Sequence, residues 1–219
     1  MEENVITAAP PRFENDFLDR LQDLYLWRRD VRRFRADPVD PALIDTLIHL
    51  AMLAPSVGNS QPWRFVKVDD PERRLAVRHN FEACNREALL AYSGDRAQLY
   101  ARLKLSGLEQ APVHLAIFSD TATKRGRGLG QRTMPQMLDY SVVCAVHALW
   151  LAARAHGIGM GWVSILEPQT IRQIIDVPEH WTLIAYLCLG YAEEEHLDPE
   201  LERHGWQERV NGAGLILQR

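Results

Sequence analysis

The chain has few cysteines, no long uninterrupted apolar run and no excess of basic residues, and each absence argues against a class of protein. Its three cysteines, Cys84, Cys144 and Cys188, are an odd number without a C-x-x-C pair, which is typical of a reduced intracellular protein. The net charge of −4 argues against a general nucleic-acid binder. The longest apolar stretch, 142–153, is interrupted by His147 and is shorter than the roughly 20 residues of a membrane-spanning helix.

Other signatures are also missing. The eight histidines are scattered, with no H-E-x-x-H motif and no Cys/His set at zinc spacing, so we expect no metal site. Residues 1–11 contain acids and prolines where a signal peptide would have basic and apolar regions, so we expect no leader and a cytoplasmic protein. A length of 219 residues with 47% apolar side chains fits a single domain with a large core, 1–219, in which residues 1–14 form an N-terminal arm.

Start signals and apolar periodicity divide the chain into helices and strands. Asp40-Pro41 and Asp70-Pro71 each place a capping carboxylate before a proline at the first helical position, and therefore predict helices that begin there. Apolar patterns predict strands over 64–68, 113–118, 161–165 and 183–191, and further helices over 17–29, 99–108 and 169–175. Strands separated by helices, with helices dominating, indicate an α+β or α/β layered fold.

The segment 135–156 is predicted to be the longest helix, ended by Gly157. It is apolar nearly all round, so it must be buried on every side, and a subunit interface could supply part of that cover. His147, in its middle, is interpreted as a hydrogen-bonded core residue. From Ala192 onward the chain is polar with few apolar anchors, and we expect it to reach over a neighbour.

Five arginines lie among residues 28–35, where a helix gives way to an extended segment. Guanidinium groups bind phosphate through paired hydrogen bonds, although a charge run is more commonly a solvated surface. Asp30 lies inside this cluster. It either pairs with an arginine or is a carboxylate held beside a bound anion, and we expect the neighbouring cations to lower its pKa.

Three further segments have two interpretations each. Residues 54–63 offer a glycine, Gly58, and several polar side chains suited to a heterocycle, or form an ordinary helix-to-strand connection. The glycine-rich turn 157–161 follows a helix and precedes a strand, the reverse of a dinucleotide loop, and Ser164 after it either contacts a cofactor or caps the next turn. The basic loop 124–132 is interpreted as solvated, with phosphate binding as the alternative.

Together these segments resemble one family, the nitroreductase-like flavoproteins. The shared features are Arg-Arg-x-x-Arg after an N-terminal helix, A-P-S-x-x-x-x-Q-P-W, a long apolar helix and a G-x-G-x-G-W turn, and they cover about residues 25–210. The finer resemblance is to the flavin-fragmenting members of the family. It rests on Arg28-Arg29-Asp30-Val31-Arg32, because ordinary nitroreductases usually have Ser where this chain has Asp30.

The resemblance implies an α+β fold with a central mixed or antiparallel sheet surrounded by helices, in an intertwined homodimer with FMN sites at the interface. Residues 78–108 would form a lid, and 192–219 would extend over the partner subunit. Reduced FMN would be the substrate and would react with molecular oxygen to give 5,6-dimethylbenzimidazole and erythrose 4-phosphate. NAD(P)H would act only through a separate flavin reductase. No nucleic acid or membrane partner is implied.

The resemblance also implies site residues. The cofactor-binding set is Arg28, Arg29, Asp30, Val31, Arg32, Ser56, Val57, Gly58, Leu105, Ser164 and Arg209. The arginines would hold the phosphate and ribityl region, residues 56–58 would line the isoalloxazine, and Leu105 would pack near the ring. Asp30 is the candidate base near ribityl C1′ and Ser164 the polar group near N5, which makes these two the candidate catalytic residues. The alternatives are an NAD(P)H-dependent FMN nitroreductase and, in a different class, a non-catalytic flavin-binding protein.

Overall fold

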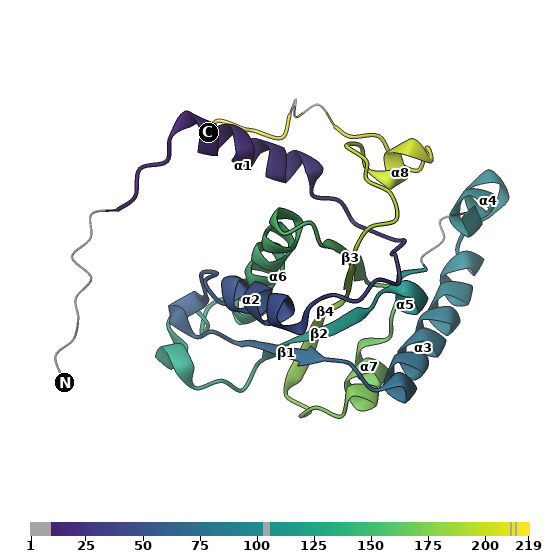
Figure 1. Ribbon diagram of the computed structural model, residues 1–219. Helices are drawn as coiled ribbons and strands as arrows, with labels where there is room; N and C mark the ends of the chain where they lie inside the picture. The colour runs from purple at the N-terminus through teal and green to yellow at the C-terminus, as the bar shows by residue number, and fades with distance from the viewer. Residues whose placement is uncertain (1–9, 103–105, 211, 213) are drawn as a thin grey trace.

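Four antiparallel strands form a central sheet in the order β1-β2-β4-β3 (Figure 1). The structure, a computed structural model, describes residues 10–102, 106–210, 212 and 214–219. The strands are β1 (Trp63–Lys67), β2 (Val113–Asp120), β3 (Gly159–Val163) and β4 (Trp181–Gly190). The helices are α1 (Asn15–Trp27), α2 (Pro41–Ala51), α3 (Pro71–Leu90), α4 (Gly94–Arg102), α5 (Gly107–Gln110), α6 (Met137–Ala155), α7 (Pro168–Ile175) and α8 (Glu200–Arg203), with two 3₁₀ turns, η1 (Val57–Asn59) and η2 (Arg125–Gly128). The α+β fold with an antiparallel sheet is therefore confirmed.

Capping carboxylates begin two of the helices as the sequence predicts. The Asp40 side chain accepts the backbone N–H of Ala42 at 2.9 Å, at the start of α2. The Asp70 side chain accepts that of Glu72 at 2.9 Å, at the start of α3. Because the first N–H groups of a helix have no partner within it, these side chains fix where each helix begins. The four predicted strands are also present, with ends shifted by a few residues.

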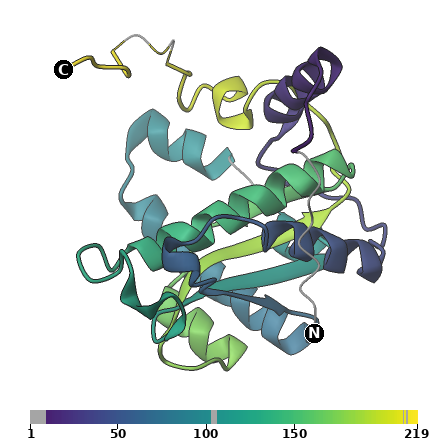
Figure 2. The ribbon, with the colours of Figure 1, turned by 90° about the vertical axis from the view of Figure 1, so that its left-hand side faces the viewer.

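Alternating side chains of the strands build two cores, one on each face of the sheet. In β2, Leu115 and Ile117 pack with α2 and α6, whereas Ala116 and Phe118 pack with residues of α3, α5 and α7. Figure 2 shows α6 on one side of the strands and α7 on the other. Since successive strand residues point to opposite faces, a sheet with apolar residues at both positions must be covered twice. Helix α1 and the C-terminal residues lie outside these layers (Figures 1 and 2).

The structure corrects three predictions about helices. Helix α3, with 20 residues, is longer than α6, with 19. The helix predicted over 99–108 is two, α4 and α5, of which α4 begins at Gly94. Within this single chain α6 is not buried on every side, because Val143, Cys144 and His147 are exposed along one face. His147 is therefore no core residue here. Gly157 does end α6, in the left-handed region at φ 72°.

The strand register separates two segments that the sequence singled out. Trp63, which follows η1, lies opposite Ser119 at one end of β2. Val113, at the other end of β2, lies opposite Leu189, which in turn pairs with Met160. Asp30 forms a bridge with Met160. Residues 56–58 and residue 30 of one chain are therefore at opposite ends of the sheet. None of the helices within the described ranges has the length and apolar content that crossing a bilayer requires.

Candidate functional site

Asp30 is held against strand β3 by backbone contacts. The N–H of Val31 donates to the carbonyl of Met160 at 3.0 Å, and Asp30 Oδ1 accepts the N–H of Trp162 at 2.9 Å. The two backbones can approach this closely because residue 161 is glycine, since a Cβ there would overlap the carbonyl oxygen of Val31. The glycine-rich turn thus serves to bring the arginine-rich segment onto the sheet.

The Asp30 carboxylate lies in a mixed environment. Its Oδ2 is 3.5 Å from Nε of Arg32, and 39% of the side chain remains exposed. Surrounding protein raises the pKa of Asp30, and the N–H of Trp162 and the charge of Arg32 only partly offset that effect. The sequence-based expectation of a lowered pKa is therefore wrong, because loss of solvent outweighs the neighbouring cation. A carboxylate with a raised pKa holds a proton more readily than an ordinary surface aspartate.

Asp30 and Ser164 line the same cavity, of about 200 Å³. Its walls come from the arginine-rich segment, β3 and the turn after it, helices α3 and α4, and the C-terminal segment: Asp30, Arg32, Phe81, Asn85, Tyr100, Trp162, Ser164, Ile165, Leu201 and Trp206. The cap of α7 is Glu167, whose carboxylate accepts the N–H groups of Gln169 and Thr170. Ser164 is therefore not needed as a cap and stays exposed at the cavity.

Aromatic rings connect the proposed lid to the C-terminal segment beside this cavity. Tyr92 and Tyr100 stack with centroids 5.0 Å apart, and Trp206 meets Tyr92 edge-on at 5.5 Å. The hydroxyl of Tyr100 donates to Asn85 Oδ1 at 2.7 Å, which ties α4 to α3. Such pairs stabilise contacts beyond the area they bury. Leu105, expected near the flavin ring, lies outside the described residues.

A second cavity, also of about 200 Å³, adjoins the first and shares Asp30, Arg32 and Leu201 with it. Arg28, Arg29 and Arg209 line it, together with the Glu200 carboxylate. Burial lowers the pKa of Arg29 most, and the charges of Arg209 and Arg28 lower it further. The pKa of Arg28 is also lowered, by burial and by the charge of Arg209. The buried Arg29 Nε has no hydrogen-bond partner in the described structure. Mutually repelling cations with an unused donor form a site that suits a phosphate.

Residues 56–58 lie away from both cavities and have local roles in the chain. The N–H of Val57 donates to Ser141 Oγ at 3.0 Å, and Ser56 Oγ accepts the N–H of Gln61 at 3.1 Å. Gly58 is left-handed, at φ 56°, and packs directly on η2, where a Cβ would be 3.0 Å from the carbonyl of Gly126. The basic loop therefore buttresses this segment. Its cationic side chains, Lys124, Arg125, Arg127 and Arg132, are exposed.

Comparison with known proteins agrees with this architecture. A family model described as "Nitroreductase family" matches residues 25–191. The chain belongs to the nitroreductase family. It is 56% identical over 199 residues to 5,6-dimethylbenzimidazole synthase of Rhodospirillum rubrum, covering 91% of this chain and 94% of that protein. A protein of the same name from Rhodobacter capsulatus is 46% identical over 198 residues, covering 90% and 96%.

Solved structures of the nitroreductase type share the fold. Oxidized iodotyrosine deiodinase, crystallised with FMN and 3-iodo-L-tyrosine, superposes with a TM-score of 0.69 at 24% identity, over 80% of this chain and 91% of that one. A putative NADH dehydrogenase/NAD(P)H nitroreductase of Parabacteroides distasonis gives 0.64 at 18% identity, over 91% and 98%. The family resemblance read from the sequence is confirmed.

The structure of this nitroreductase-family chain shows cavity residues that were not predicted from the sequence. Tyr100, Leu201 and Trp206 line the cavity of Asp30 but were not among the predicted site residues, and Trp162, the last residue of the G-x-G-x-G-W turn, lines it as well. From the sequence around Trp206, only Arg209 was predicted as a site residue. Conversely, Ser56, Val57 and Gly58 were predicted as site residues but do not line the cavities of Asp30 and the arginines within one chain. Among the residues described, no three His, Cys, Asp or Glu side chains gather in a way that could hold a metal ion.

Proposed function

We propose that this chain is a 5,6-dimethylbenzimidazole synthase, which uses molecular oxygen to fragment reduced FMN. The observation that carries the proposal is the 56% identity, over 91% of the chain, to a relative of that name. The products would be 5,6-dimethylbenzimidazole, with one carbon from the ribityl chain, erythrose 4-phosphate from the other ribityl carbons, and a separate fragment that carries the pyrimidine portion of the ring. FMN would therefore be a substrate, delivered in reduced form by a separate NAD(P)H-dependent flavin reductase.

The phosphate of FMN would bind the cavity of Arg28, Arg29 and Arg209. A phosphate would relieve the repulsion among these cations and accept from the unpartnered Arg29 Nε. The ring and ribityl chain would then extend into the adjoining cavity, past the wall that Asp30 and Arg32 share.

Asp30 would act as the base near ribityl C1′. Its Oδ1 is fixed by the N–H of Trp162, which orients the second oxygen toward Arg32 and the cavity. Its raised pKa favours proton acceptance, since a general base is most effective when its pKa approaches the working pH. The Ser164 hydroxyl, exposed in the same cavity, would donate to ring N5.

A second copy of the chain would complete the site with its residues 56–58. Within one chain, residues 56–58 and Asp30 lie at opposite ends of the sheet. Residues 56–58 of one chain could therefore approach Asp30 only if that Asp30 belongs to a second chain. Exposed apolar side chains are available to form the interface, on α6 (Tyr140 and Val143), on α1 (Phe17 and Leu18) and in the C-terminal residues (Leu215, Ile216 and Leu217). A homodimer would also cover the apolar face of α6.

Product analysis tests the proposal. The purified protein is mixed with reduced FMN under argon, air is admitted, and 5,6-dimethylbenzimidazole is sought by mass spectrometry. Its appearance together with loss of FMN is the expected result. Clean reoxidation to intact FMN would reject fragmentation, and steady NAD(P)H oxidation with a nitroaromatic acceptor would then favour a nitroreductase. Stoichiometric FMN binding without any turnover would favour the flavin-binding protein.

A further inference from the structure

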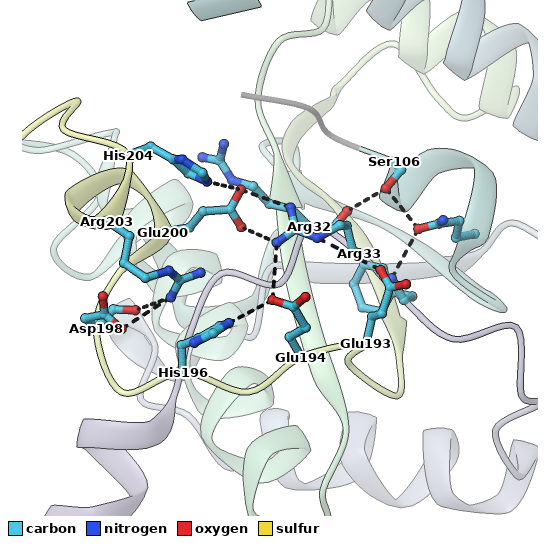
Figure 3. Close-up of polar contacts among 12 residues, drawn as sticks. Arg32, Arg33, Ser106, Glu193, Glu194, His196, Asp198, Glu200, Arg203 and His204 are labelled. Carbon is cyan, nitrogen blue, oxygen red and sulfur yellow. Dashed lines mark hydrogen bonds and ion pairs between the residues drawn. The ribbon is translucent and has the colours of Figure 1, made fainter. Parts of the chain in front are cut away.

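A partly buried ion pair joins the C-terminal segment to the arginine-rich segment (Figure 3). Glu200, on α8, accepts from both terminal nitrogens of Arg33, at 3.2 Å for Oε1 and 3.4 Å for Oε2. Only 10% of the Glu200 side chain is exposed, against 31% for Arg33. Paired, charge-assisted hydrogen bonds of this kind fix direction as well as distance, and they weaken less in salt when buried.

The pair of Glu200 and Arg33 is the polar contact that attaches the C-terminal residues to the rest of the described structure. Within the described structure, the hydrogen bonds of Glu200 to Arg33 are the sole polar contacts that join residues 197–219 to the chain before residue 192. The remaining polar contacts of the segment are internal, such as Arg203 with Asp198 at 3.3 Å. Glu193 and Glu194 also approach Arg33, each at 4.0 Å, but they lie directly after the strand that already holds them.

Helix α8 and the turn after it supply two residues that line the cavity of Asp30, Leu201 and Trp206. Leu201 follows Glu200 directly, and the N–H of Trp206 donates to the Leu201 carbonyl at 2.8 Å, which brings both side chains to the same place. Trp206 then packs on Tyr92 and lies 6.2 Å from Tyr100. A shift of α8 would therefore open the cavity on one side and withdraw the Trp206 ring from Tyr92 and Tyr100.

We propose that Glu200 is a positioning residue for the flavin site. Through its paired bonds to Arg33 it holds Leu201 in the cavity wall and Trp206 against Tyr92 and Tyr100. It would touch no reacting atom. Glu200 is placed for this because it points inward from a helix of a single turn, which has little packing of its own to hold it. The inference rests on the proposed function for the identity of the ligand, but the contact itself is a property of the protein alone.

The test compares Glu200→Gln with Glu193→Gln in the full-length protein. Both changes remove one carboxylate beside Arg33, but only the first releases α8, while Glu193 is 54% exposed and keeps its backbone bond to Arg33. Without ligand, trypsin cleavage after Arg203 should quicken about tenfold in Glu200→Gln and stay within about twofold of wild type in Glu193→Gln. Glu200 also lines the cavity proposed for the phosphate, where loss of its negative charge alone would strengthen binding of an anion. If Glu200 acts by positioning α8, the dissociation constant of oxidised FMN, followed by flavin fluorescence, should instead rise about tenfold in Glu200→Gln alone.

A double-mutant cycle separates a specific contact from general damage. Arg33→Gln combined with Glu200→Gln should lose little more protection and FMN affinity than Glu200→Gln alone, because both changes remove the same contact. Should Glu200→Gln not fold by circular dichroism, Glu200→Asp keeps the charge, shortens the reach and should show the same changes in weaker form. Cleavage and FMN affinity equal to wild type in the Glu200 variant, or equal losses in the Glu193 variant, would overturn the proposal. Absence of benzimidazole from wild type would count against the proposed function only.

Discussion

Replacing Asp30 by Asn is the sharpest test of the proposed chemistry. The amide has the size of the carboxylate, and its oxygen can still accept the N–H of Trp162, so the segment should stay on β3. What the variant loses is the charge beside Arg32 and the capacity to take up a proton. Shape and chemistry are thereby separated at one position.

The structure sets the expected magnitudes. The contact of Asp30 with Arg32 is 3.5 Å long and partly exposed, and such pairs contribute about 1 kcal/mol or less, so folding should hardly change. FMN affinity should stay within about threefold, because the arginines of the phosphate cavity are untouched. Benzimidazole formation should fall by about 10²–10⁴, which is the usual contribution of a general base and corresponds to ~3–5 kcal/mol of barrier.

The assay is a single turnover of bound reduced FMN after admission of air, with benzimidazole quantified by mass spectrometry. Asp37→Asn is the matched control, since Asp37 lies in the same segment and pairs with Arg35 at 2.8 Å on the exposed surface. In wild type the rate should decline as the pH falls through the raised pKa of Asp30, and the variant should lack that limb. Full product yield from Asp30→Asn would remove the carboxylate from the mechanism.

Three further outcomes are expected. Ser164→Ala should slow fragmentation about tenfold or more with FMN binding kept; an unchanged single-turnover rate would leave its hydroxyl without a role. Gly161→Ala should destabilise the fold by about 1–3 kcal/mol in denaturant titrations, because the added methyl overlaps the Val31 carbonyl, and a wild-type midpoint would contradict that packing. His114 is buried with Nδ1 2.9 Å from the Tyr186 hydroxyl, and burial lowers its pKa from 6.5 to about 4. The unfolded chain then binds the proton more readily, so stability is full above pH 6.5 and should fall by roughly 2 kcal/mol between pH 7 and pH 5, a slope that His114→Asn should lack.

Features that depend on neighbouring residues were predictable from the sequence. Asp40 and Asp70 bond groups two residues away, so the helix starts follow from adjacent residues alone. The strands are short apolar runs whose side chains fill the two cores. The family was also predictable, since its motifs are contiguous. The length of α3 was not, because Val77 is its single buried residue among those described and the helix has no apolar periodicity to recognise.

Features that depend on distant residues were not predictable. The pKa of Asp30 is raised by burial, which depends on how segments far along the chain pack around it, whereas the adjacent arginines pointed to a lowered pKa. Glu200 and Arg33 are 167 residues apart, and neither belongs to a recognisable motif. His147 was interpreted as a core residue because its neighbours in the sequence are apolar, but its side of α6 faces outward in the single chain. Burial is decided by the packing of whole elements.

The separation of residues 56–58 from Asp30 has a genetic consequence under the proposed pairing. Each site would be formed by two copies of the same polypeptide. One copy would contribute its arginine-rich segment and the other its residues 56–58. A chain defective at Asp30 and a chain defective at Gly58 would then complement each other when they share a cell, because a mixed dimer keeps one site in which both contributions are intact. Alleles at the two ends of the sheet would fall into separate complementation groups within a single gene.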